Sequence, residues 1–128
     1  MIVLDASFLI AHMETDDAHH EQATQTLLDL APEQFAASPL TLAEVLTGPL
    51  RQGTVNQALG MLNGMNVLTV PLGADGPLRL ASLRATTKLK LPGCCVLLAA
   101  ERMEAEAIAT FDARLAAAAQ VRGLTVIA

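Results

Sequence analysis

Hydrophobic residues along this chain gather either in short unbroken runs or at intervals of three to four residues. The runs are three or four residues long, with a threonine inside those at 67–70 and 124–127, and they end at polar or turn residues, which is typical of short strands. They predict a sheet of four to five short strands. The expected strands cover 2–4, 35–37, 67–70, 107–110 and 124–127.

The spaced hydrophobic residues predict amphipathic helices between these strands. Ala23, Leu27 and Leu30, for example, fall on one helical face, and Pro32 should end that helix. The other expected helices cover 6–13, 39–50, about 55–62, 77–89, 92–103 and 113–121. Gly48 and Pro49 are expected to kink or end the helix that contains them. Alternating strands and helices indicate an α/β fold with a mainly parallel sheet flanked by helices, built as a single domain over 1–128.

Composition argues against some classes of function but does not identify one. The chain has 128 residues, of which 52% are hydrophobic, so a full core is available. The formal net charge of −5 counts against a general nucleic-acid binder. It does not exclude a nuclease whose carboxylates hold divalent cations, because the metal supplies positive charge locally. The only aromatic residues are Phe8, Phe35 and Phe111, which argues against a base-stacking platform.

The same sequence indicates a cytoplasmic protein that does not contact a membrane. Cys94 and Cys95 are neighbours and cannot form an ordinary structural disulfide, which fits a reducing compartment. No basic leader precedes the apolar opening. The longest apolar stretch, 91–100, contains Pro92 and Gly93 and is shorter than the roughly 20 residues of a membrane-spanning helix.

Three acidic residues stand out by position. Asp5 and Asp112 follow predicted strands, and strand ends of a parallel sheet meet at one edge, where ligands bind. Glu44 lies in an otherwise apolar helix, where a carboxylate needs a partner. Grouped carboxylates repel one another, and a cation relieves that repulsion. Oxygen ligands without a histidine or cysteine pattern favour Mg²⁺ or Mn²⁺ over zinc.

A second interpretation stays open for each acid. Asp5 and Asp112 can be the N-caps of the helices that follow them. Thr41 and Glu44 have the spacing of a capping box, in which the glutamate reaches back to the start of its helix.

Four segments together resemble the motifs of PIN-domain ribonucleases, and VapC toxins of bacterial toxin–antitoxin pairs most of all. They are 2–7 (IVLDAS), 38–45 (SPLTLAEV), 89–92 (LKLP) and 109–115 (ATFDARL). Each motif is short, but their order and spacing agree over essentially the whole chain.

The resemblance implies a PIN-like three-layer fold and a Mg²⁺- or Mn²⁺-dependent endoribonuclease that acts as a toxin on cellular RNA. It also implies a cognate antitoxin that blocks the site, and a homodimer. By matched position, Asp5, Glu44 and Asp112 would be the catalytic, metal-binding acids. Ser7 and Thr110 would be supporting polar residues, unless their hydroxyl groups only bond locally.

Position 93 departs from the pattern. Family members typically have aspartate directly after the proline that corresponds to Pro92, whereas this chain has Gly93. Glycine has no side chain to bind a cation, and nothing local in the sequence requires it. Two explanations are open: a natural variant of reduced activity, or a change introduced so that a toxic nuclease could be produced. We therefore expect a folded chain that cleaves RNA poorly.

Arg84 and Lys88 complete the expected site as RNA-binding residues, because a spacing of four places them on one face of the predicted helix. A solvated helix face is the alternative for this pair. Two other functions compete with the nuclease. One is a catalytically degenerate PIN-like binding module. The other is a receiver-like signalling domain, although an acid pair after the first strand and a late lysine are missing from this chain.

Overall fold

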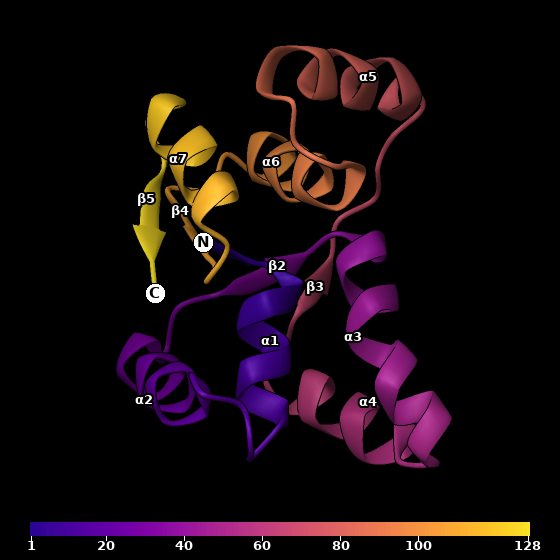
Figure 1. The fold of residues 1–128 in the computed structure, drawn as a ribbon, viewed down its shortest axis with the longest axis vertical. Helices are drawn as coiled ribbons and strands as arrows, with labels where there is room; N and C mark the ends of the chain where they lie inside the picture. Colours follow the sequence, from indigo (N-terminus) through magenta and orange to yellow (C-terminus); the bar gives the residue numbers. More distant parts are fainter.

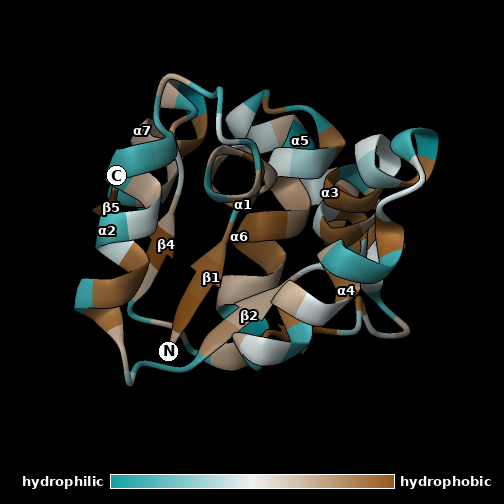
Figure 2. Ribbon diagram, turned by 90° about the horizontal axis from the view of Figure 1, so that it is seen from below, coloured by the Kyte–Doolittle hydropathy of each residue, from teal (hydrophilic) through white to brown (hydrophobic).

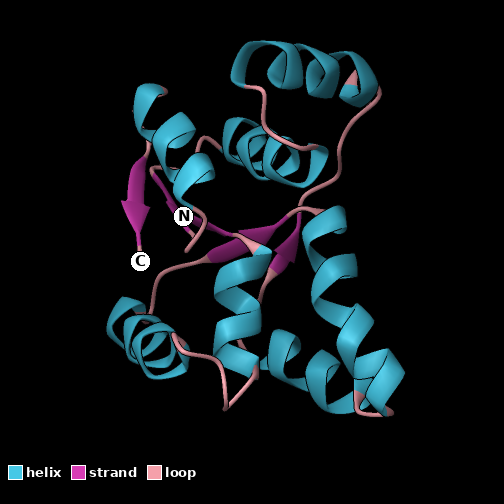
Figure 3. Ribbon diagram, in the orientation of Figure 1, coloured by secondary structure: helices cyan, strands magenta, loops and turns pink.

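The computed structural model describes residues 1–128, and one sheet of five parallel strands lies at its centre (Figure 3). The strand order is β3-β2-β1-β4-β5. The strands are β1 (Ile2–Leu4), β2 (Phe35–Ala37), β3 (Leu68–Thr69), β4 (Ala107–Ala109) and β5 (Thr125–Ile127). Every pairing is parallel, so the predicted mainly parallel sheet is confirmed.

Helices cover both faces of this sheet and produce three layers. In Figure 1, helices α1 to α4 lie below the strands and α5 to α7 lie above them. The lower helices are α1 (Ala6–Met13), α2 (His20–Leu30), α3 (Pro39–Gln52) and α4 (Val55–Gly64). The upper helices are α5 (Gly76–Thr87), α6 (Leu91–Met103) and α7 (Ala113–Val121). The predicted three-layer α/β fold is therefore present.

The core has two parts because successive strand residues point to opposite faces of the sheet. Ile2 and Leu4 pack with side chains of α1 to α4, whereas Val3 between them packs with side chains of α5 to α7. All three are buried, and β1 is brown in the hydropathy view of Figure 2. Strands β1, β2 and β4 are buried on both faces, which explains why these three segments contain hydrophobic residues only, whereas the edge strands β3 and β5 are more exposed and contain threonine.

The order of the strands fixes where a ligand can bind. The chain runs from β1 outward to β2 and β3, and then returns to β4 on the other side of β1. The direction of winding thus reverses between β1 and β4. In open parallel sheets the crevice for ligands lies outside the carboxyl ends of the strands at such a reversal. Asp5 follows β1 there, and Asp112 comes shortly after β4.

Two helix ends differ from the prediction. Helix α3 continues through Pro49 to Gln52, rather than ending or kinking at the proline. Pro49 lies in the last turn, where a missing N–H removes one intrahelical hydrogen bond, and Gly53 then ends the helix with φ 75°. Helix α5 ends at Thr87 instead of 89, and Lys88 has left-handed backbone with φ 63°. None of the helices combines the length and apolarity that a membrane crossing requires.

Candidate functional site

The three predicted acids line one cleft at the carboxyl end of the sheet. Its volume is about 450 Å³. Asp5 enters it from the end of β1, Glu44 from α3, and Asp112 from the start of α7. Gly93, in the first turn of α6, lines the same cleft. Four segments far apart in the sequence therefore meet where the strand order reverses.

Asp5 is buried and held in place by two hydroxyl groups. Its Oδ2 accepts hydrogen bonds from Ser7 Oγ and Thr110 Oγ1, each at 2.7 Å. Its backbone N–H donates to the carbonyl of Ala109 at 3.0 Å, which joins the end of β1 to the end of β4. The side chain does not cap α1, so the capping interpretation is wrong for this residue. The other carboxylate oxygen, Oδ1, has no hydrogen-bond partner in the protein.

Ser7 and Thr110 connect Asp5 to the segment that carries Asp112. Ser7 Oγ accepts from the backbone N–H of Phe111 at 3.0 Å, and Thr110 Oγ1 accepts from the backbone N–H of Asp112 at 2.9 Å. Each hydroxyl has one proton, and that proton goes to Asp5. These two side chains therefore fix both the orientation of Asp5 and the backbone leading to Asp112.

Asp112 has two roles that share one carboxylate. Its Oδ1 accepts from the backbone N–H groups of Arg114 at 2.9 Å and Leu115 at 3.2 Å, so it caps α7 as one interpretation predicted. Its Oδ2 has no hydrogen-bond partner in the protein, and the side chain is exposed in the cleft. Capping with one oxygen leaves the other available to a ligand.

Glu44 lies within α3 and does not take part in a capping box. The N-cap of α3 is Ser38, whose Oγ accepts from the backbone N–H of Leu40 at 3.2 Å. Thr41 is already inside the helix, so the predicted Thr41–Glu44 box is wrong. The Glu44 side chain is exposed at the cleft rather than buried among apolar neighbours. Partial removal from water and the negative charge of Asp5 raise the pKa of the Glu44 carboxyl.

Glu44→Gln is expected to raise the free energy of unfolding at pH 7, because a neutral amide is not repelled by Asp5. The pKa of Glu44 is higher in the folded state than in the unfolded state, so its ionisation disfavours folding. The gain should therefore be complete above the raised pKa and disappear as the pH falls below the ordinary glutamate range. Urea denaturation at several pH values measures it. Glu21→Gln, at an exposed position of α2, is the control and should give no gain.

The chemistry of these donors suits a hard divalent cation, but the site is incomplete as it stands. Asp5 and Asp112 each have one carboxylate oxygen without a protein partner. The pKa of Glu44 is raised by partial removal from water and by the negative charge of Asp5, and a cation would offset that charge. No three His, Cys, Asp or Glu side chains lie close enough together to hold one metal ion. Gly93 lines the same cleft and, having no side chain, adds no further donor.

Nothing in the structure requires glycine at position 93. The residue is third in α6, and its φ lies outside the left-handed region that favours glycine. A Cβ there would meet Leu89 Cδ1 at 3.5 Å and Leu115 Cδ1 at 3.9 Å, which are ordinary van der Waals distances. A Cβ at 93 therefore fits without rearrangement.

Gly93→Ala should stabilise the protein by about 0.5–1 kcal/mol, because alanine loses less backbone entropy than glycine on entering a helix. The change in urea midpoint at constant slope measures this gain. Gly53→Ala is the matched control. Its φ of 75° is strained for alanine, so that variant should be destabilised instead. A Gly93→Ala variant that is less stable than the parent chain would show that the packing around 93 does need glycine.

Three cations also line the cleft, and only one of them was predicted. Lys88 is present, but Arg84 is not among the lining residues. The left-handed backbone at Lys88 takes it off the face of α5 that Arg84 occupies, so the prediction of a shared face was wrong. The other two cations, Lys90 and Arg114, were missed. The available signal was that Lys90 lies within 89–92 and Arg114 within 109–115, two of the segments that resemble family motifs and that meet at this cleft.

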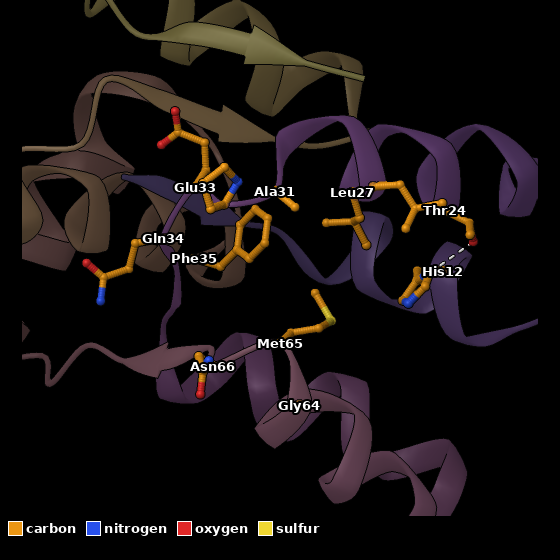
Figure 4. Close-up of a pocket in the computed structure, with 12 residues that line it drawn as sticks. His12, Thr24, Leu27, Ala31, Glu33, Gln34, Phe35, Gly64, Met65 and Asn66 are labelled. Carbon is orange, nitrogen blue, oxygen red and sulfur yellow. Dashed lines mark hydrogen bonds between the residues drawn. The ribbon is translucent and has the colours of Figure 1, made fainter.

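A pocket of about 730 Å³ lies elsewhere, between the end of α2, the start of β2 and the end of α4 (Figure 4). Phe35 and Met65 supply apolar walls, and His12 Nδ1 lies 2.9 Å from Thr24 Oγ1 at one end. Glu33 is the only acidic residue in its lining. This pocket contains none of the predicted site residues, so a cation site built on several carboxylates belongs to the cleft.

Comparisons with known proteins agree with this fold. The family model described as PIN domain matches residues 2–121. A toxin–antitoxin complex from Klebsiella pneumoniae contains a similar chain, with 23% identity, a TM-score of 0.79, and coverage of 100% of this chain and 97% of that one. The sarcin–ricin-loop-cleaving toxin VapC20 of Mycobacterium tuberculosis is similar at 19% identity and a TM-score of 0.78, covering 92% and 95%. No curated protein matches the chain.

Proposed function

The chain belongs to the PIN-domain family, and from that premise we propose that it is the toxin of a toxin–antitoxin pair, an endoribonuclease dependent on Mg²⁺ or Mn²⁺. The observation that carries the proposal is the shared cleft of Asp5, Glu44 and Asp112 at the reversal of strand order. The names of two similar structures, a toxin–antitoxin complex and an RNA-cleaving toxin, support it.

Each acid has a role that follows from its surroundings. Asp5 and Asp112 would be the main cation ligands, because each keeps one carboxylate oxygen free of protein hydrogen bonds. Glu44, exposed at the same cleft, would complete the ligand shell or orient a water. A divalent cation bound there would stabilise negative charge on the phosphate and would lower the pKa of a nearby water. Ser7 and Thr110 are positioning residues, since both donate to Asp5.

The basic residues of the cleft would hold the RNA backbone. Lys88, Lys90 and Arg114 line it, and none of them is in an ion pair. A cationic side chain that is in no ion pair can bind a phosphate without first breaking one. These three residues replace the predicted pair of Arg84 and Lys88 as the proposed substrate contacts.

Gly93 is proposed to impair this activity, because the wall of the cleft at that point has no carboxylate. The same observation supports a second candidate, a PIN-like module that binds but does not cleave. It is strengthened by the lack of any three donors grouped closely enough for a metal ion. The receiver-like alternative is set aside, because the PIN-domain model covers residues 2–121.

The proposed partners are a cognate antitoxin, RNA, and a second copy of this chain in a homodimer, all in the cytoplasm. The similarity to a chain of a toxin–antitoxin complex supports the first of these. RNA cleavage by the Gly93→Asp variant tests the proposed function. It should require Mg²⁺ or Mn²⁺ and stop when EDTA is added. RNA that remains intact at every concentration of the variant would favour the binding module instead.

A further inference from the structure

A second groove, of about 780 Å³, lies between the C-terminal end of α5 and helix α7. Both helices belong to the upper layer in Figure 1. The groove is lined by three cations, Lys88, Arg114 and Arg122, and by no Asp or Glu. The whole chain has 8 Lys and Arg residues against 13 Asp and Glu, so an acid-free groove with three cations is a marked local concentration of positive charge.

The groove adjoins the acid cleft. Lys88, Leu89 and Arg114 line both. A chain molecule held at the three acids would therefore leave the cleft between Lys88 and Arg114 and enter the groove directly. Arg122 lies beyond them, one residue past the end of α7.

These cations are available to an anionic ligand. Lys88 and Arg114 are exposed and in no ion pair. Arg122 Nη1 is 3.6 Å from Glu101 Oε1, a long contact between exposed groups that is worth little in water. Glu101 is held much more closely by Arg79, through its other oxygen at 2.6 Å. A phosphate can therefore compete for Arg122 at small cost.

We propose that this groove binds the backbone of single-stranded RNA that runs away from the acid cleft. The proposal rests on the proposed nuclease function, and it adds where the substrate lies outside the reacting phosphate. Charge and adjacency favour RNA over an acidic protein segment, because the ligand must also reach the cleft. No aromatic side chain lines the groove, so stacking on bases is absent and the contacts are to phosphates, independent of sequence.

The neighbouring side chains fit a strand held through its phosphates. Ala117 and Ala118 form a low wall along α7, and Val121 is 89% exposed at its end. Small residues let the backbone of a ligand approach the helix closely. Cations at the cleft end and at the far end of the groove then hold successive phosphates.

The test measures RNA binding by the whole chain in EDTA, where cleavage does not occur. Fluorescence anisotropy would compare a labelled uridine trinucleotide, which occupies the cleft, with a uridine 12-mer, which also reaches the groove. Arg122→Glu and Ala117→Glu place negative charge in the groove. Arg51→Glu and Ala81→Glu, at exposed positions that line neither groove nor cleft, are matched controls with the same change in net charge.

Each groove variant is expected to bind the 12-mer about tenfold more weakly than its control, while trinucleotide affinity stays equal. The dependence of log K on log salt should also become shallower, by about 0.7 for each phosphate that the protein no longer neutralises. Equal 12-mer affinity in groove and control variants would overturn the proposal, as would failure of the parent chain to bind the 12-mer in EDTA. Suppose the groove variants bind an oligoglutamate peptide more weakly than their controls but bind the 12-mer equally well. The groove then serves an acidic protein segment, and the RNA proposal is wrong.

The binding measurement in EDTA does not depend on whether the protein cleaves RNA. Absence of cleavage by Gly93→Asp would refute the proposed nuclease while leaving the length-dependent loss of RNA binding unaffected. Conversely, cleavage of a short RNA by Gly93→Asp should persist when Arg122→Glu is added, whether or not the groove binds RNA.

Discussion

Gly93→Asp is expected to raise the rate of Mn²⁺-dependent RNA cleavage by about 100-fold. Removal of one group that supports a metal site lowers activity by up to about this factor, and the substitution restores such a group. Position 93 lines the cleft together with Asp5, Glu44 and Asp112, and it has room for a Cβ. It is also the third residue of α6, where a negative side chain interacts favourably with the helix N-terminus. The new carboxylate therefore costs the fold little and adds a donor where none exists.

The measurement is the initial rate of cleavage of a labelled RNA at saturating Mn²⁺. Gly93→Asn is the matched control, because asparagine has nearly the same size but no negative charge. Gly93→Ala controls for the gain in helix stability alone. Equal rates in the Asp and Asn variants would contradict the account, since the effect would then come from the side chain's bulk rather than from its charge.

Asp5→Asn, made in the Gly93→Asp background, should lower the cleavage rate by about 10³-fold, or about 4 kcal/mol of transition-state stabilisation. Asp5 is the buried acid of the cleft, and its Oδ1 has no hydrogen-bond partner in the protein and is therefore free to bind a cation. The amide has no charge, and when its oxygen keeps the two hydroxyl hydrogen bonds, its NH₂ group takes the place of Oδ1, where it cannot bind a cation.

The same substitution should reduce the free energy of unfolding by only about 1–2 kcal/mol, the usual effect of disturbing a partly buried hydrogen bond. Cleavage and urea unfolding measured on one preparation separate the two effects. Asp16→Asn, at an exposed position away from the cleft, should change neither. If the lost activity is matched by an equal loss of folded protein, Asp5 has a structural role only.

Much of the fold could be predicted from local pattern. The strand at 2–4 and the helix at 113–121 agree with β1 and α7 to the residue, because an unbroken buried run and an alanine-rich run are both strong local signals. The convergence of Asp5 and Asp112 followed from strand ends meeting at one edge of a parallel sheet. That Asp5 and Asp112 share a cleft was therefore predictable from the sheet, whereas Glu44, inside a helix, was assigned to the same site by the family resemblance.

Other features depended on contacts between distant parts of the chain. Thr110 is 105 residues from Asp5, and nothing in either segment alone predicts that its hydroxyl donates there. Lys88 leaves the face of α5 because its own backbone turns left-handed, which a helical pattern does not reveal. The three phenylalanines were expected not to form a base-stacking platform. In the structure Phe8 stacks on Phe111 with ring centroids 5.1 Å apart, and His19 covers the ring of Phe111 from 4.3 Å.

The central claim is that Asp5, Glu44 and Asp112 form one cation site in a cleft that Gly93 leaves incomplete. The most direct test is a crystal structure of Gly93→Asp soaked in Mn²⁺, with anomalous diffraction used to locate the ion. The account predicts an Mn²⁺ peak in the cleft, in contact with the free oxygens of Asp5 and Asp112, and a weaker peak in the parent chain. A cleft without Mn²⁺ in the Gly93→Asp crystal, at a concentration that fills other carboxylate sites, would contradict it.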